Sequence, residues 1–465
     1  MHKLPRIAVV VDLLVILAGL IAVVIVPVAF LVPYNDEWLR MNYLANHSAW
    51  EWTVMHIETW VVRPTTDLIL AVCSLPLTRP ALAGDFTPEA MLTRFHAVYV
   101  ALALVYFAML YVNAAIVART LRALPLTVLF FFGLLTCWFM ASELQFAFYF
   151  ADGYYNILLP FALCCCGLPL LMRENLVAAG SGALLAIGGV LGHEVIAIYT
   201  LGVLSVALVF RRPLLQPWRM RALWAGLFAI CFGLLLWQLF GAGPSVRAAQ
   251  YLKTVGKSYN FETAWLNVRE IHPLRALLSV LSVPLAIAIY RDQLGDLADR
   301  TSADFRRQRW FRILLLALGT LLTAFLPLWA AGLKKGRLAV SYYSVFAHLL
   351  FALCGALLYP IVARWLDPAL AGYRQRVGSL LPLLVLVVAC SGNLVEYREA
   401  VTNLKPLRAE AFAYMHQLFD APKSARLRLC RPRHVYSKPP RMLTDHNERD
   451  YFGLQQVRHK CPQMR

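Results

Sequence analysis

Two adjacent carboxylates, Asp36 and Glu37, stand directly after a long apolar run, in the segment "YNDEWLRMNY" at 34–43. A carboxylate within hydrogen-bond reach of an attacking hydroxyl or phosphate can take its proton. A leaving group that departs as a phosphate also needs cations, which stabilise the charge that it develops. The pair is therefore a candidate base for group transfer to a carbon centre. The alternative is a solvated cap at a helix boundary.

The candidates for the phosphate-binding cations are spread along the chain. They are Arg63, Lys253, Lys257, Lys334, Lys335 and Arg337. Arg63 could instead anchor its segment at a membrane interface, and the two lysines at 253 and 257 could bind anionic lipid heads. These cations and the acidic pair together favour a substrate that carries a phosphate.

A further group of residues could line a substrate cavity, namely Arg40, Glu58, Tyr154, Tyr155 and Asn156. The stretch "ADGYYNILLP" at 151–160 places aromatic rings beside polar groups, which suits a sugar or a lipid head, although an interfacial aromatic belt has the same composition. Asp152, His193 and Glu194 could act as ligands of a divalent cation, Mg²⁺ or Mn²⁺, if they meet in space. His193 and Glu194 could equally form a structural pair at a tight connection.

The composition sets the elements that must position these residues. Of 465 residues, 60% are hydrophobic and 15% are charged, far more apolar surface than a soluble domain can bury. The run at 7–32 is long enough to cross a membrane and predicts a retained first helix. Further runs lie at 95–118, 123–141, 155–172, 176–192, 195–210, 222–241, 273–290, 312–332, 342–363 and 377–394. We predict an all-α polytopic membrane protein with about eleven transmembrane helices.

The basic residues give this protein an orientation. Connections that carry arginine alternate with connections near 142–154 and 192–194 that carry neither Lys nor Arg, so the N-terminus is expected in the cytoplasm. Every candidate residue above then falls on the outer face. The segment "KKGR" at 334–337 breaks the alternation, which phosphate binding at the outer leaflet would explain. The net charge of +18 is mostly this orientation signal plus a basic tail, and no nucleic-acid motif accompanies it.

Two domains follow from this topology. Residues 1–395 form the transmembrane module, in which the Trp-rich first outer loop at 33–94 is expected to hold interfacial helices. Residues 396–465 form a basic outer tail, where Cys430 and Cys461 could close a disulfide. The run Cys164–Cys166 cannot converge on one metal ion, because consecutive helical residues point about 100° apart.

The arrangement resembles the GT-C glycosyltransferases, membrane enzymes that use polyprenyl-phosphate sugars as donors. The segment "NDEWLR" resembles the Asp-Glu motif of protein O-mannosyltransferases and lipid A aminoarabinose transferases, and "WVVRP", "ADGYYNILLP" and "GHEV" resemble segments of related bacterial membrane proteins. The resemblance covers about residues 1–345. It implies that Asp36 is the catalytic base and that Glu37 assists it or binds a metal. It also implies a bacterial inner-membrane location with a periplasmic tail, and a lipid, glycan or protein acceptor.

Other function classes compete with this interpretation. A polymerase or ligase of lipid-linked glycans would work on the same face and could rely on arginines rather than a carboxylate. A secondary transporter would place ionisable residues in the middle of its spans and show internal repeats, and a flippase would need a polar path through the bilayer. Charged residues in this chain gather instead at the predicted outer ends of the spans.

Overall fold

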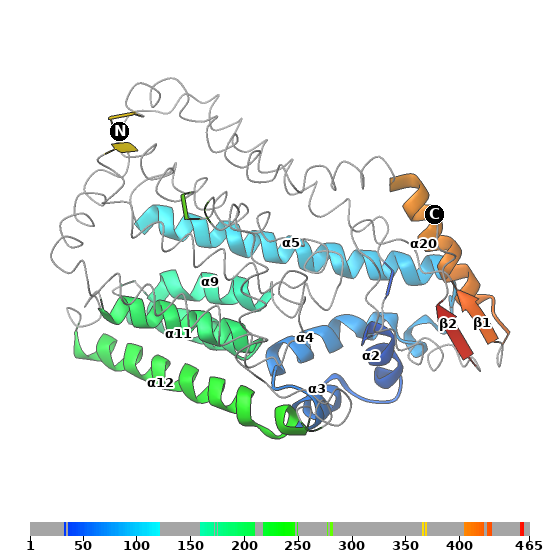
Figure 1. Ribbon diagram of the computed structural model, residues 1–465, viewed down its shortest axis with the longest axis horizontal. Coiled ribbons are helices and arrows are strands. Elements are labelled where there is room, and N and C mark those ends of the chain that lie inside the picture. Colours follow the sequence, from blue (N-terminus) through cyan, green and yellow to red (C-terminus); the bar gives the residue numbers. More distant parts are fainter. Residues whose placement is uncertain are drawn as a thin grey trace.

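The computed structural model describes residues 32–33, 36–120, 159–171, 173, 175–209, 217–246, 404–422, 426–429 and 456–459, with isolated positions between 249 and 369. This part of the chain is predominantly helical, as predicted (Figure 1). A small two-stranded sheet near the C-terminus is a feature that the sequence patterns did not predict.

Five of the predicted apolar runs are helices. They are α5 (Pro88–Thr120), α9 (Leu159–Leu171), α10 (Leu176–Val190), α11 (Glu194–Val209) and α12 (Trp218–Phe240). Among the described residues, one helix is long and apolar enough to cross a membrane, α12 with its continuation to Val246. The helices α9, α10 and α11 have 13, 15 and 16 residues, whereas a straight crossing takes about 20. The predicted runs thus identified these helices, and the number of crossings stays a prediction.

Glycines let α9 and α10 pack with their backbones close together. A Cβ added at Gly167 would lie 2.5 Å from the carbonyl oxygen of Gly182, and one added at Gly189 would lie 2.6 Å from that of Pro160. No side chain fits at these distances. Small residues at a helix interface are the usual way for apolar helices to approach this closely.

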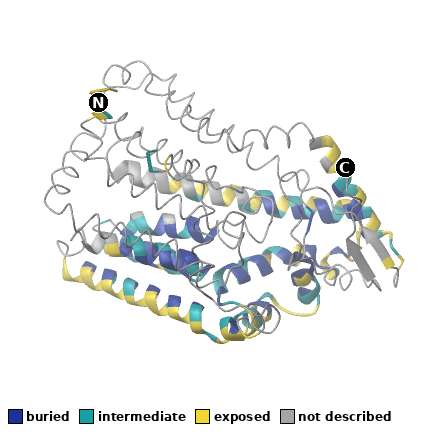
Figure 2. Cartoon of the chain, viewed as in Figure 1, coloured by how far each residue is buried: buried dark blue, intermediate teal, exposed yellow. Residues whose placement is uncertain are grey.

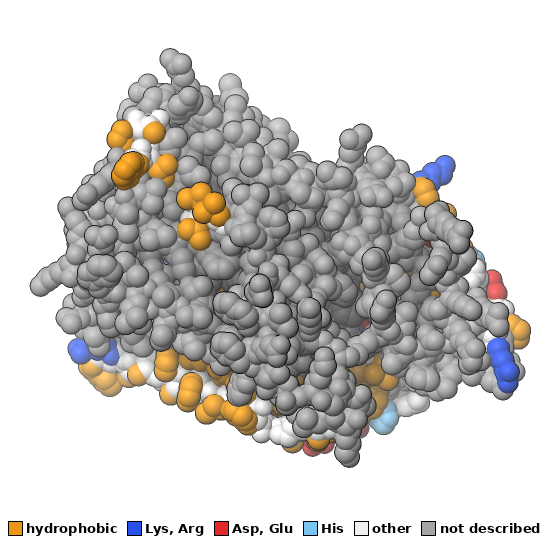
Figure 3. All heavy atoms as spheres, viewed as in Figure 1, with side chains coloured by type: hydrophobic (Ala, Val, Ile, Leu, Met, Phe, Trp, Pro, Cys, Tyr) orange, Lys and Arg blue, Asp and Glu red, His pale blue; other side chains and the backbone are white. Residues whose placement is uncertain are grey.

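Helix α12 has one buried face and one exposed face (Figure 2). Its residues Trp224, Leu227 and Cys231 pack in a core with residues of α10 and α11. Its opposite face exposes large apolar side chains, and Figure 3 shows hydrophobic side chains gathered along the lower left edge of the molecule, with other atoms between them. The most exposed of them are Trp218, Ile230, Phe232 and Phe240. A solvated face of this length would ordinarily be polar.

The first loop folds into three short helices, α2 (Asp36–Leu44), α3 (Ala49–Thr59) and α4 (Pro64–Ser74), followed by the 3₁₀ turns η1 (Leu75–Leu77) and η2 (Pro80–Leu82). A capping box begins α3, in which the Ser48 side chain accepts from the Glu51 backbone and Glu51 accepts from the Ser48 backbone. Proline at the first position begins α4. The helices predicted for this loop are therefore present, and their position on a membrane surface stays a prediction.

The described part of the tail packs against the beginning of α5. Helix α20 (Leu404–Phe419) contacts α5, where His416 Nε2 lies 2.8 Å from a carboxylate oxygen of Glu89. The rings of Phe419 and Phe86 lie 4.6 Å apart. Two strands follow, β1 (Arg426–Leu429) and β2 (Gln456–His459), paired in parallel. Cys430 and Cys461 lie outside the described residues.

Cys164 and Cys166 of α9 are buried packing residues. Cys164 is buried, with its Sγ 2.9 Å from the Thr200 hydroxyl of α11. Cys166 turns the other way and donates to the Met109 carbonyl of α5 at 3.1 Å. The two thiols thus face different helices.

Candidate functional site

The acidic pair stands at the beginning of α2. Asp36 is the first residue of this helix, and Glu37 follows in its first turn, where the helix dipole favours negative charge. Glu37 is only 3% exposed, and Trp38 and Met41 on the same helix are fully buried. The orientation of the Asp36 side chain lies outside what the structure describes. The sequence argument expected a solvent-facing carboxylate or a catalytic one, and Glu37 is enclosed by protein.

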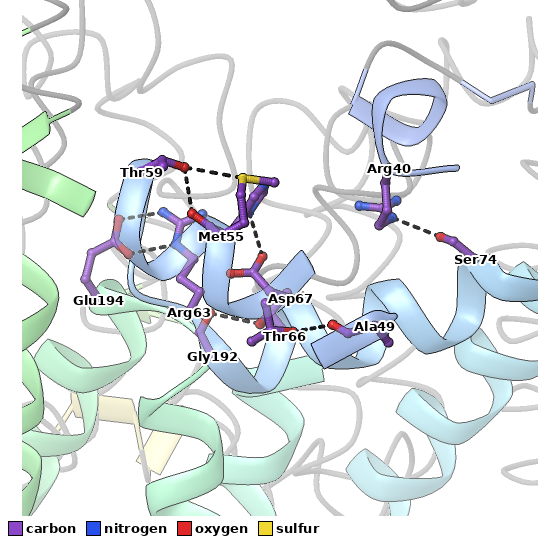
Figure 4. A network of polar contacts seen from close by, with 12 residues as sticks. Arg40, Ala49, Met55, Thr59, Arg63, Thr66, Asp67, Ser74, Gly192 and Glu194 are labelled. Atoms are coloured by element: carbon purple, nitrogen blue, oxygen red, sulfur yellow. Dashed lines mark hydrogen bonds and ion pairs between the residues drawn. The ribbon is translucent and has the colours of Figure 1, made fainter. Parts of the chain in front are cut away.

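Arg40 ties α2 to α4. Its side chain is 4% exposed, and its Nε donates to the Ser74 hydroxyl at 2.9 Å (Figure 4). The Ser74 hydroxyl in turn donates to the Leu70 carbonyl at 2.8 Å. Arg40, proposed from sequence as a cavity residue, therefore lies one helical turn after the acidic pair and is held by a buried hydrogen bond.

A buried ion pair links the first loop to α11. Arg63, just before α4, donates from Nε and from one terminal nitrogen to the two carboxylate oxygens of Glu194, at 3.0 and 2.7 Å (Figure 4). The two side chains are 10% and 13% exposed. Such a two-point pair is the strongest geometry that these groups offer. It brings together two candidate residues that lie 131 positions apart in the sequence.

Helix α4 packs against the turn between α10 and α11, beside this ion pair. The Thr66 hydroxyl donates to the Gly192 carbonyl at 2.9 Å, and a Cβ at Gly192 would overlap the ring of Pro160. His193 follows and is fully buried. Its Nδ1 accepts the Val195 backbone N–H at 3.1 Å, which assigns the ring proton to Nε2 in the neutral tautomer. His193 thus caps α11.

The ion pair settles the charge of Glu194. Burial is the largest single influence and raises the pKa of this carboxyl, but the charge of Arg63, the neighbouring His193 and the hydrogen bonds to the carboxylate together hold the pKa well below its usual range. The charge of Arg63 is thus neutralised by Glu194, which weakens its attraction for a phosphate. The geometry favours a structural role for Arg63 as the link between the first loop and the α10–α11 turn.

Sequence reasoning missed a second polar pair one turn further along α4. His56 of α3 has its Nδ1 3.3 Å from an oxygen of Asp67, and the Asp67 side chain is 5% exposed. The ring of Trp52 lies 4.2 Å from that of His56. The sequence signal was the four-residue spacing of Trp52 and His56, which puts both on one helical face, opposite a carboxylate in the first turn of the next helix.

The remaining candidates are not assembled by the described residues. Glu58 is exposed on α3. Within the described part of the chain, no three His, Cys, Asp or Glu side chains come together to hold a metal ion. Nine candidates lie outside that part: Asp152, Tyr154, Tyr155, Asn156, Lys253, Lys257, Lys334, Lys335 and Arg337.

The described site thus joins the first-loop helices α2, α3 and α4 to α11, and it carries charged residues in three settings. Glu37 and Arg40 are buried in α2. Arg63 and Glu194 neutralise one another, and His56 contacts one oxygen of Asp67. Such a site can supply a carboxylate base and a titratable imidazole beside an apolar helical core. Comparisons of the chain with protein-family models, with curated proteins and with solved structures find no match.

Proposed function

We propose that the chain is an integral-membrane glycosyltransferase that moves a sugar from a polyprenyl-phosphate donor to a lipid, glycan or protein acceptor at the outer face of a bacterial inner membrane. Asp36 takes the proton of the acceptor as its oxygen attacks the anomeric carbon, and Glu37 assists. The polyprenyl phosphate leaves with the electron pair of the broken bond.

The observation that carries this proposal is the burial of Glu37 at the beginning of α2. Burying a carboxylate costs free energy. The burial of Glu37 directly after an apolar segment therefore favours a chemical role for this carboxylate. The neighbouring Arg40 is fixed by Ser74, so the first two turns of α2 are rigidly held. A catalytic group needs such a support.

Membrane insertion is supported by the described helices. The exposed face of α12 is lined by Trp218, Ile230, Phe232 and Phe240, which lipid tails would cover. The close packing of α9 on α10 through glycines is typical of helices that associate in lipid. About eleven crossings are part of the proposal, by the length that a crossing needs.

The tail contact supports a common face for the tail and the first loop. Helix α20 packs on α5 near Glu89, close to where the first loop ends. An even number of crossings between the first loop and α20 would place both on the outer face, in agreement with a cytoplasmic N-terminus. A periplasmic tail that covers the first loop is therefore part of the proposal.

Glycosyl transfer in membranes is the experiment that tests this function. Right-side-out vesicles that contain the protein would be given a panel of radiolabelled polyprenyl-phosphate sugars, and vesicles without the protein serve as the control. We expect label to move in a single step to one acceptor class. A ladder of repeated additions would identify a polymerase instead. Label that enters the lumen without any covalent product would identify a transporter.

A further inference from the structure

The pair formed by His56 and Asp67 has an unusual charge balance. Asp67 is buried, and one of its oxygens lies 3.3 Å from His56 Nδ1. The other oxygen, Oδ2, is buried and has no hydrogen-bond partner among the residues that the structure describes. A buried carboxylate with half of its acceptor capacity unused is costly unless a positive charge balances it. A protonated His56 would supply that charge.

The position of His56 leaves its ring open to a ligand. The side chain is 20% exposed, while Trp52 covers one face of the ring at 4.2 Å. An ionised carboxylate only accepts hydrogen bonds, so Nδ1 carries the proton that points to Asp67. Protonation then adds an N–H at Nε2, which donates on the side of the ring away from Asp67.

Other charged groups near His56 are already engaged or lie in solvent. Arg63, just before α4, is paired with Glu194 of α11. On α3, Glu51 caps its own helix and Glu58 is exposed. On α2, Tyr43 lies near these residues, and its ring contacts that of Trp52 edge-on. The continuation of α12 at 241–246 approaches α3 near Ile57 and contains no ionisable residue.

The other histidines with a nearby carboxylate are arranged differently. His47 lies 3.9 Å from Glu51, and their side chains are 47% and 58% exposed. His416 pairs with Glu89 at a similarly open site. His193 is sealed and uses Nδ1 as an acceptor. Among these described histidines, His56 alone combines a buried carboxylate with a partly accessible ring.

We propose that His56, balanced by Asp67, is the cation of the first loop that binds the prenyl-phosphate leaving group, which becomes a phosphate monoester as the sugar departs. The inference rests on the proposed function for the identity of that ligand. The ligand phosphate accepts from Nε2–H while Asp67 accepts from Nδ1–H. The positive imidazolium thus lies between two negative groups, the phosphate and the carboxylate. His56 thereby takes the role that the sequence suggested for Arg63, whose guanidinium is held by Glu194.

Binding of farnesyl phosphate to the purified full-length protein in detergent tests this proposal. Farnesol and phosphatidylglycerol are the comparison ligands, because they offer the prenyl chain alone and a lipid phosphodiester. We expect farnesyl phosphate to bind about tenfold more tightly at pH 6 than at pH 8, because only a protonated imidazole donates from both ring nitrogens. Farnesol should show no such dependence. Equal competition by phosphatidylglycerol would overturn the prenyl-phosphate assignment.

Variants separate a binding role from a structural one. His56→Gln should weaken farnesyl phosphate about tenfold at pH 6 and remove the pH dependence. His56→Lys should keep binding at pH 8, where the unaltered protein weakens, which a purely structural role would not produce. His47→Gln is the matched control on the same loop and should bind like the unaltered protein.

Two results would contradict the inference in different ways. Unchanged affinity and pH dependence in His56→Gln would overturn it and leave the proposed function standing. No binding of farnesyl phosphate by the unaltered protein would also overturn it, and glycosyl transfer in vesicles would then decide the proposed function separately.

Discussion

Two opposite charges lie one turn apart at the beginning of α4, Arg63 just before the helix and Asp67 in its first turn, and their partners differ. Arg63 meets both oxygens of Glu194 at 2.7 and 3.0 Å, and each side chain satisfies the other. One oxygen of Asp67 contacts the partly exposed imidazole of His56, and the other oxygen has no hydrogen bond to the described residues. The two ionisable residues lie in the same loop, and their partners decide which role each can take. A mutually satisfied pair holds the fold, and a half-satisfied one is available to a ligand.

Removing one partner of the satisfied pair should have the largest effect. Glu194→Gln leaves the buried Arg63 guanidinium without a counter-charge, and we expect a loss of about 3 kcal/mol in the free energy of unfolding. Unfolding by sodium dodecyl sulfate in mixed micelles measures this. The double variant Arg63→Met with Glu194→Leu should recover most of the loss, because it leaves no buried charge. A single variant as stable as the unaltered protein would refute the structural role.

Acid should reveal the same pair. The folded-state pKa of Glu194 is lowered, so its stabilisation is present above the unfolded-state pKa of about 4.3 and is lost as pH falls through the folded-state value. The stability difference between the unaltered protein and the double variant should therefore stay constant from pH 8 to pH 5 and change only in stronger acid. A difference that already disappears near pH 6 would point to a histidine instead.

Asp67→Asn should cost less stability than Glu194→Gln. One of the two Asp67 oxygens has no hydrogen bond to lose, and an amide can keep the contact with His56, so we expect a change of about 1 kcal/mol or less. The same unfolding measurement applies. A loss as large as that of Glu194→Gln would show that Asp67 is as much a structural charge as Arg63, and the contrast between them would fail.

His47→Ala should have the smallest effect. His47 lies 3.9 Å from Glu51 on the exposed side of the loop, and exposed pairs of this kind contribute about 0.5 kcal/mol or less. Unfolding in the presence of 0.5 M salt gives a further check, since screening should remove the little that remains. A large loss would indicate that the row of rings from His47 through Tyr43 to Trp52 acts as one unit.

Sequence patterns predicted the helices better than the contacts between them. Apolar runs located α5, α9, α10, α11 and α12, because burial or lipid contact demands apolar residues along the whole length of such helices. They missed how early α5 begins, at Pro88, since its first two turns mix charged and polar residues with apolar ones. They also missed β1 and β2, which are four residues each and pair across 26 intervening positions.

The candidate site was predicted in its residues and not in its pairings. Arg63 and Glu194 were both selected, for phosphate and for metal, and the structure pairs them with one another. That contact depends on how α4 docks on the α10–α11 turn through Thr66 and Gly192, which no local pattern encodes. His56 was overlooked because its four-residue spacing from Trp52 indicates a shared helical face and does not identify the residue packed against that face. Burial of Glu37 likewise became evident only from the packing of α2.

Glycosyl transfer by Asp36→Asn and Glu37→Gln is the measurement that tests the central claim most directly. Each variant would be compared with the unaltered protein in the same vesicles, with the same labelled polyprenyl-phosphate sugar and equal amounts of folded protein. We expect Asp36→Asn to abolish transfer, because an amide cannot take the acceptor's proton, and Glu37→Gln to reduce it. Undiminished transfer by Asp36→Asn would contradict the account and place the base elsewhere.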